Sequence, residues 1–132
     1  MKTFIVEDND VILKNLVATL REFTPVTLVG TASDATSAID WLMQPKNHFD
    51  LVIIDIFLKS SSGLTVLSSI FDLSIQAKRV VLTNYATPEL RARCAALGAH
   101  RVFDKSSEME ELIAYCVLLQ EEKNLYAGET KH

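Results

Sequence analysis

The side chains that could do chemistry in this sequence stand at or just after the ends of four short apolar segments. Two carboxylates, Glu7 and Asp8, follow the first of these segments, and a third carboxylate, Asp55, follows another. The Thr83 hydroxyl and the Lys105 ammonium group belong to the remaining two. Such a set supplies oxygen ligands for a hard cation, a carboxylate nucleophile, and two groups that can bind the oxygens of a transferring phosphoryl group.

Taken singly, most of these residues have an ordinary structural explanation. Acidic residues after a strand commonly cap the following helix, and Asp8 could do only that. Asp55 is different because it directly follows Leu51–Ile54, an apolar run that a strand covered on both faces would bury. A buried carboxylate is costly unless it is paired or metal-bound, so Asp55 is the residue we most expect to be functional.

Several carboxylates at one edge of a sheet would repel one another, and that repulsion favours a bound cation. Two unit charges ~4 Å apart interact by roughly 4 kcal/mol at an effective dielectric constant of about 20. An all-oxygen site with few carboxylates favours Mg²⁺, which keeps several waters and commonly binds a phosphate. Beside such a cation and Lys105, Asp55 can attack phosphorus to form an acyl phosphate. Lys105 and the Thr83 hydroxyl would then neutralise and hydrogen-bond the transferring oxygens.

The segments that must position these residues are predicted to be five strands alternating with five helices. Short β-branched apolar runs predict the strands, and apolar residues at 3.6-residue spacing between them predict the helices. The predicted strands are 3–6, 26–30, 51–54, 80–82 and 101–103. Strict alternation with short loops predicts one three-layer α/β domain around a parallel sheet. In such a sheet ligands bind outside the carboxyl ends of the strands, where all of the residues above would gather.

The helix boundaries are clearest in the second half of the chain. The fourth helix is expected to be capped by Thr87, to carry Pro88 in its first turn and to end at Gly98. The fifth is expected to open with a capping box made by Ser107 and Glu110. The polar segment that follows residue 123 is expected to fray. The expected organisation is therefore a domain over residues 1–123 and a polar tail over residues 124–132.

Composition excludes several classes of protein. The chain of 132 residues suits one domain, and 48% apolar with 23% charged residues predicts a packed core. A net charge of −4 argues against binding nucleic acid through a basic face. Two cysteines, outside any C-x-x-C, do not make a disulfide scaffold or a zinc module. Since no signal peptide or apolar run of ~18 residues appears, we expect a cytoplasmic protein without a membrane span.

Taken in order and at their spacings, the motifs resemble the receiver domain of two-component response regulators. The resemblance extends from residue 2 to about residue 122. The matching pieces are FIVEDN at 4–9, DLVIID at 50–55, glycine at 63, VVLT at 80–83, GA at 98–99 and FDKS at 103–106. The resemblance implies a flavodoxin-like three-layer sandwich, with five parallel strands in the order 2-1-3-4-5 and helices on both faces. That order places the topological switch point between the first and third strands, which precede the acid pair and Asp55.

The resemblance also implies a metal site. Asp55 would be the phosphorylated residue and a ligand of Mg²⁺. Asp8 would bind the ion directly, and Glu7 would bind it through water. The backbone carbonyl of Phe57 would complete the protein ligands.

The remaining roles implied by the resemblance concern the phosphoryl group and its consequences. Thr83 would contact the phosphoryl group, and Lys105 would pair with it. The donor would be a phosphohistidine on a histidine kinase or a phosphotransfer protein. Phosphorylation would switch the conformation of the domain to control a downstream partner, and a homodimer is one outcome of that switch. The domain would catalyse only its own phosphorylation and dephosphorylation, without direct contact to nucleic acid or membrane.

The chain departs from the family pattern around the site. Lys59 stands where many members carry proline, which predicts a looser loop after the third strand. Val102 occupies the position of the aromatic residue whose rotation often reports phosphorylation, and Tyr85 and His100 are the candidates to replace it. We also expect the bulky Phe57 and Tyr85 side chains to shield the acyl phosphate from water and lengthen its life.

Two other functions remain open at the level of sequence. The first is a pseudo-receiver that binds its partners without phosphorylation. The unusual Val102 keeps this alternative open, although the intact set of site residues argues against it; that set is Glu7, Asp8, Asp55, Thr83 and Lys105. The second is a phosphatase with an aspartate nucleophile, but such enzymes usually carry a second acid two residues after the nucleophile. That position is Phe57, which argues against a phosphatase.

Overall fold

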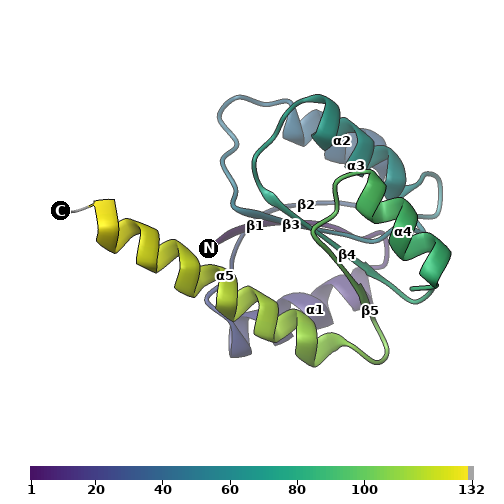
Figure 1. Cartoon of the computed structure of the whole chain (residues 1–132). Coiled ribbons are helices and arrows are strands. Elements are labelled where there is room, and N and C mark those ends of the chain that lie inside the picture. The colour runs from purple at the N-terminus through teal and green to yellow at the C-terminus, as the bar shows by residue number, and fades with distance from the viewer. Residues whose placement is uncertain (131–132) are drawn as a thin grey trace.

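The computed structural model of the protein describes residues 1–130 and shows a five-stranded parallel sheet covered by helices on both faces (Figure 1). The strand order is β2-β1-β3-β4-β5, which confirms the predicted order and the flavodoxin-like architecture. The strands are β1 (Lys2–Val6), β2 (Thr27–Ala32), β3 (Leu51–Ile54), β4 (Lys78–Thr83) and β5 (Arg101–Asp104). The helices are α1 (Asp10–Phe23), α2 (Ala35–Leu42), α3 (Gly63–Asp72), α4 (Pro88–Ala96) and α5 (Met109–Thr130).

The core is divided by the sheet into two apolar layers. Alternate residues of each central strand enter opposite layers, so Val52 and Ile54 pack on one face while Leu51 and Ile53 pack on the other. Helices α2, α3 and α4 cover the first face, and α1 and α5 cover the second (Figure 1). Because both faces of β3 are buried, its sequence is continuously apolar, as the sequence predicted. Each such side chain contributes roughly 1.5–3 kcal/mol of burial free energy.

The predicted boundaries of α4 are confirmed. The Thr87 side chain accepts a hydrogen bond from the Leu90 backbone N–H, and Pro88 is the first residue of the helix. Gly98 follows the end of the helix with a φ of +96°, a conformation that favours glycine. These features set the length of α4 and bring the chain back to begin β5.

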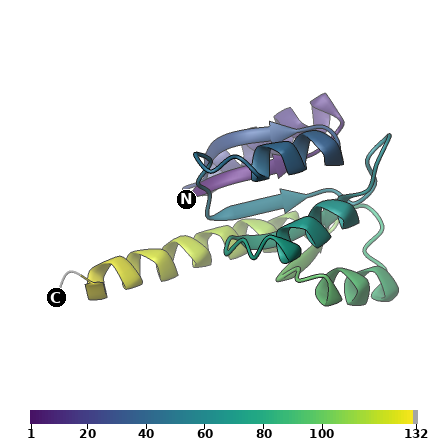
Figure 2. The ribbon, with the colours of Figure 1, turned by 90° about the horizontal axis from the view of Figure 1, so that it is seen from above.

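Two expectations about α5 are wrong. The capping box between Ser107 and Glu110 does not form, because the helix begins two residues later, at Met109. Instead, the Asp104 carboxylate accepts hydrogen bonds from the backbone N–H groups of Ser106 and Ser107. The segment expected to fray is helical to Thr130, and Figure 2 shows α5 extending well beyond the sheet.

Two exposed contacts lie at the predicted end of the domain, in the middle of α5. The Lys123 ammonium group forms an ion pair with Asp50, the residue before β3, at 2.9 Å. One turn apart on the helix, the Gln120 amide donates a hydrogen bond to the Asn124 side chain at 2.9 Å. Residues 131 and 132 of the predicted tail lie outside the described residues, and the domain boundary at residue 123 stays a prediction. Within residues 1–130, no helix has the length and apolar character that crossing a membrane requires.

Candidate functional site

The ladder of hydrogen bonds that builds the sheet also positions the candidate site residues at its carboxyl edge. The backbone N–H of Asp55 donates to the Val6 carbonyl at 3.0 Å, one step past the end of β3. In the same way, the backbone N–H of Lys105 donates to the Thr83 carbonyl at 2.9 Å. Because these groups are fixed by main-chain pairing, their side chains leave the sheet at defined points along one edge.

Three carboxylates converge at this edge. Glu7, Asp8 and Asp55 each present one oxygen atom, and the three atoms lie within 4.8 Å of one another. Glu7 and Asp55 are only 4% and 7% exposed, whereas Asp8 is half-buried. A convergent set of carboxylate oxygens with one open side fits a hard cation such as Mg²⁺, which favours oxygen ligands and retains water.

The Lys105 ammonium group balances the two buried carboxylates. Its Nζ atom lies 2.5 Å from Glu7 Oε1 and 2.9 Å from Asp55 Oδ2. Burial acts to lower the pKa of Lys105, but its hydrogen bonds to Glu7 and Asp55 outweigh burial and raise that pKa above its usual value. Lys105 is therefore charged at neutral pH and stands directly beside the oxygen of the expected nucleophile.

Glu7 is the carboxylate whose ionisation the fold disfavours. Burial raises the pKa of Glu7 above its usual value, and the neighbouring Asp55 charge acts in the same direction. Lys105 opposes both effects but does not cancel them. The stability that Glu7 contributes is therefore present below the ordinary pKa of glutamate, and it is lost as the pH rises through the raised native value.

Replacing Glu7 with glutamine is accordingly expected to stabilise the metal-free protein at neutral pH, because the amide carries no charge to be buried beside Asp55. The gain should shrink as the pH falls through the raised native pKa of Glu7 and should be gone below the ordinary pKa of glutamate, where the side chain is protonated in both the folded and the unfolded protein. If Glu7 binds the ion through water, the same change should weaken Mg²⁺ binding by ~10-fold or more. Denaturant unfolding across pH and a Mg²⁺ titration would check both effects, and a variant that is less stable at neutral pH would contradict this account.

The loop that connects β3 to α3 is tied to two other segments by hydrogen bonds, and the expectation of a looser loop stays a prediction. The Lys59 backbone N–H donates to Asp8 Oδ2 at 2.6 Å, a bond that proline could not make. Further along, the Ser61 hydroxyl accepts a hydrogen bond from the Ala35 backbone N–H at 2.9 Å, at the first turn of α2. Lys59, which stands where many members of the family carry proline, thus donates a hydrogen bond that orients Asp8, one of the expected metal ligands.

One cavity gathers most of the predicted site. It has a volume of about 210 Å³, and the predicted residues that line it are Glu7, Asp8, Asp55, Phe57, Tyr85 and Lys105. Thr83 is not among the lining residues, because it is fully buried and its hydroxyl oxygen accepts a hydrogen bond from the Tyr85 backbone N–H at 3.3 Å. A contact between Thr83 and a phosphoryl group would therefore require the chain around Asn84 to move.

The cavity also has lining residues that the sequence analysis did not assign to it, namely Asn9, Ile12, Lys59 and Asn84. Asn84 directly follows the predicted residue Thr83, and this position in the sequence could have identified it as a site residue. Asn9 caps α1, because its side chain accepts a hydrogen bond from the Ile12 backbone N–H at 3.0 Å. Its place at the cavity follows from that cap.

Two aromatic side chains stand at the mouth of the cavity. The rings of Phe57 and Tyr85 meet edge to face, with 5.1 Å between their centroids. Both remain more than half exposed, at 53% and 63%. Each side chain comes from a different loop, so together they narrow the approach to Asp55 from solvent.

The position of the family aromatic residue is occupied differently here. Val102 is half-buried on the face of the sheet that α2, α3 and α4 cover, while Phe103 enters the opposite layer. His100 precedes β5, at the edge of the sheet away from the site, and its Nδ1 accepts a hydrogen bond from the Arg79 backbone N–H. His100 therefore lies away from the candidate site, whereas Tyr85 lines its cavity.

Comparison with known proteins places this geometry in a family. A family model described as the response regulator receiver domain matches residues 3–116. The "Uncharacterized transcriptional regulatory protein YvfU" of Bacillus subtilis is 29% identical over 112 residues, which cover 85% of this chain and 55% of that protein. A "Putative transcriptional regulator" of Pseudomonas aeruginosa is 30% identical over 112 residues, covering 85% of this chain and 53% of that protein. The chain thus spans about half the length of these curated relatives.

Solved structures share the fold. The signal receiver domain of a putative Luxo repressor protein from Vibrio parahaemolyticus superposes with a TM-score of 0.81 at 20% identity, covering 99% of this chain and 98% of that one. A response regulator from Burkholderia pseudomallei, solved with a phosphorylated aspartic acid, calcium ion and citrate, gives 0.74 at 22% identity, covering 97% and 74%. Because the family model spans most of its length, the chain belongs to the response regulator receiver domain family.

Proposed function

We propose that this receiver domain is a phosphorylation-controlled switch in which Asp55 accepts a phosphoryl group in the presence of Mg²⁺. The donor is a phosphohistidine on a histidine kinase or a phosphotransfer protein. The observation that carries the proposal is the convergence of three carboxylates within 4.8 Å, with Lys105 bonded to two of them. This arrangement combines a nucleophile, a set of cation ligands and a fixed positive charge in one cavity.

The proposed transfer uses groups whose starting positions are known. One Asp55 carboxylate oxygen attacks phosphorus as the P–N bond of the donor breaks, and the bonding electron pair leaves with the imidazole. Lys105, now 2.9 Å from Asp55 Oδ2, exchanges that oxygen for an oxygen of the phosphoryl group. The Phe57 backbone N–H, 3.2 Å from Asp55 Oδ1, helps to hold the carboxylate in one orientation during the attack.

The proposed ligands of Mg²⁺ are Asp8, Asp55 and the backbone carbonyl of Phe57, with Glu7 binding through water. When bound, the ion supplies positive charge that neutralises the carboxylates and the transferring phosphoryl oxygens. A response regulator of the same fold from Burkholderia pseudomallei is described with a phosphorylated aspartic acid and a calcium ion, which supports the pairing of an aspartyl phosphate with a divalent cation.

The phosphoryl group is expected to last longer because of the aromatic pair at the cavity mouth. Replacing both Phe57 and Tyr85 with serine should speed hydrolysis of the acyl phosphate severalfold, since water would then reach Asp55 more freely. The decay of the phosphorylated form, followed by intact mass, measures this effect. Phe71→Ser is the matched control, because Phe71 is also exposed but lies near the C-terminal end of α3. This variant should leave the decay unchanged. Equal decay rates in the wild type and the double variant would remove the shielding role.

The output of the switch is proposed to lie outside residues 1–130. The relatives that the chain matches are named as transcriptional regulators and are about twice as long as the matching region. We propose that phosphorylation changes how this domain contacts an output domain or protein, with homodimer formation as one such change. A cytoplasmic location follows from the proposal, because the kinase that supplies the phosphoryl group acts there.

The proposal is tested by exposing the protein to a small acyl phosphate, with Mg²⁺ or with a chelator. Uptake of one phosphoryl group that requires Mg²⁺ is the expected result. A protein that takes up no phosphoryl group from any donor, yet still binds partners, would instead be a pseudo-receiver. Turnover of a generic phosphomonoester would favour a phosphatase, which the absence of an acid at Phe57 makes the weaker candidate.

A further inference from the structure

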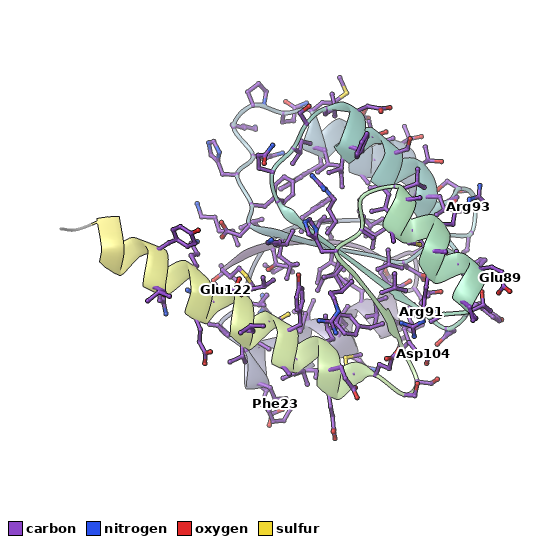
Figure 3. All side chains as sticks on the ribbon, in the orientation of Figure 1. Phe23, Glu89, Arg91, Arg93, Asp104 and Glu122 are labelled. Atoms are coloured by element: carbon purple, nitrogen blue, oxygen red, sulfur yellow. The ribbon has the colours of Figure 1, made fainter. Side chains whose placement is uncertain are left out.

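A single arginine joins α4 to three neighbouring segments. Arg91 donates from Nε to the Ala86 carbonyl at 3.0 Å and from Nη1 to the Val102 carbonyl at 2.8 Å. Its Nη2 atom lies 2.5 Å from the Glu108 carboxylate. The guanidinium group thus ties the β4–α4 loop, strand β5 and the segment before α5 to the helix that carries it. Figure 3 shows Arg91 on the side of α4 toward Asp104, while Glu89 and Arg93 project from its outer side.

The contacts of Glu108 extend this link to the candidate site. The Glu108 carboxylate that pairs with Arg91 also accepts a hydrogen bond from the Asp104 backbone N–H at 2.9 Å. Lys105 is the next residue, and its own backbone N–H is bonded to the Thr83 carbonyl. Two charge-assisted hydrogen bonds of Glu108, to Arg91 and to the Asp104 backbone, therefore connect α4 to the residue before Lys105. The peptide bond to Lys105 and the backbone hydrogen bond between Lys105 and Thr83 complete the link.

Arg91 contacts the strand position where many members of the family carry an aromatic residue, because its Nη1 donates to the Val102 carbonyl. A cavity of about 230 Å³ is bounded by Arg91, Val102 and Glu108 on this face. Because Val102 is small, the guanidinium group can reach across β5 to Glu108. The chain has no aromatic side chain at position 102 to connect the site with α4, and the Arg91–Glu108 ion pair provides a polar connection instead.

Helix α4 depends on this link because little else holds it. Cys94 is its one fully buried residue, while Leu90 and Leu97 are only partly buried against the core. A helix with so small an apolar face is easily displaced, and directional hydrogen bonds then decide its position.

We propose that Arg91 and Glu108 couple the state of Lys105 and Thr83 to the position of α4, replacing the aromatic switch of the family. The inference rests on the proposed function, since it requires a phosphoryl group or its analogue at Asp55. As Lys105 exchanges its carboxylate partner for the phosphoryl group, the chain at Asp104 shifts. Glu108 and Arg91 carry that shift to α4. Arg91 acts through other residues, so it is a positioning residue.

The coupling is tested by NMR, with amide shifts recorded before and after Mg²⁺ and beryllofluoride are added to the full chain. In the wild type, amides next to Asp55 and Lys105 and amides along α4 should all shift. In Arg91→Gln the amides next to the site should still shift, whereas those of α4 should shift by less than half as much. Arg93→Gln is the matched control, because the Arg93 side chain projects from the outer side of α4 and forms no hydrogen bond or ion pair within residues 1–130, and it should behave as the wild type.

A second variant keeps the test valid if Arg91→Gln unfolds. Glu108→Gln retains an oxygen that can accept from the Asp104 N–H but loses the charge that pairs with Arg91, so it should also reduce the α4 shifts. Full α4 shifts in Arg91→Gln or in Glu108→Gln would overturn the coupling. A wild-type protein whose site amides do not respond at all would instead overturn the proposed function.

Discussion

Replacing Lys105 with methionine is expected to lower the free energy of unfolding of the metal-free protein at neutral pH by about 3 kcal/mol. The Lys105 side chain is only 10% exposed and serves two buried carboxylates, so its loss leaves Glu7 and Asp55 facing each other without a counter-charge. A loss of that size should lower the midpoint of thermal unfolding by roughly 10 °C. If Mg²⁺ binds these carboxylates as proposed, it supplies the missing charge, and saturating Mg²⁺ should restore much of the stability but not the rate of phosphorylation.

The matched control is Lys123→Met, which removes an ion pair of similar length from a more exposed place. Lys123 lies 2.9 Å from Asp50, but these side chains are 52% and 34% exposed. Exposed pairs contribute at most about 1 kcal/mol, so this variant should unfold near the wild-type temperature and respond little to Mg²⁺. Equal losses in the two variants would contradict the role given to Lys105.

Replacing Gly63 with alanine is expected to cost about 3 kcal/mol and to disturb the site. A Cβ atom at this position would lie 2.1 Å from the Asp55 carbonyl oxygen and 2.8 Å from Ile54 Cγ2. The first of these neighbours is backbone, so relief requires α3 to move away from the residue expected to be phosphorylated. Denaturant unfolding measures the loss, and a slower phosphorylation rate would report the displaced Asp55.

Gly98→Ala separates this steric effect from backbone strain. Gly98 has a positive φ, but the nearest atoms to an added Cβ are side-chain atoms of Phe71 and Arg79, at 3.3 and 3.4 Å. Strain alone should cost about 1–2 kcal/mol and leave the site unaffected. A Gly63→Ala variant that is as stable as Gly98→Ala would show that α3 does not press on Asp55.

The sequence was sufficient for the strands and for the cluster of carboxylates at their ends. Apolar continuity in Leu51–Ile54 predicts a strand buried on both faces, and Asp55 must then emerge at the carboxyl edge. Periodicity alone does not order the strands, and the order 2-1-3-4-5 came from the resemblance to receiver domains. The structure confirms that order and brings Glu7, Asp8, Asp55 and Lys105 together.

The contacts that sequence reasoning missed are those between a side chain and distant backbone. The sequence drew attention to Lys59 only because it lacks the ring of proline, and the hydrogen bond from its backbone N–H to Asp8 was not predicted. Ser107 is a residue type that commonly caps helices. In the structure, however, its backbone N–H donates to the Asp104 carboxylate, and the helix begins at Met109. Arg91 resembled any surface arginine, because its three acceptors belong to segments whose proximity only the fold determines.

The central claim is that Asp55 accepts a phosphoryl group, and intact mass after incubation with Mg²⁺ and a small acyl phosphate tests it most directly. The account predicts that the wild type and Asp50→Asn, which alters the residue at the opposite end of β3, each gain one phosphoryl group. It predicts no gain for Asp55→Asn. Phosphorylation of Asp55→Asn to the wild-type level, or a wild type that gains no phosphoryl group from any donor, would contradict it.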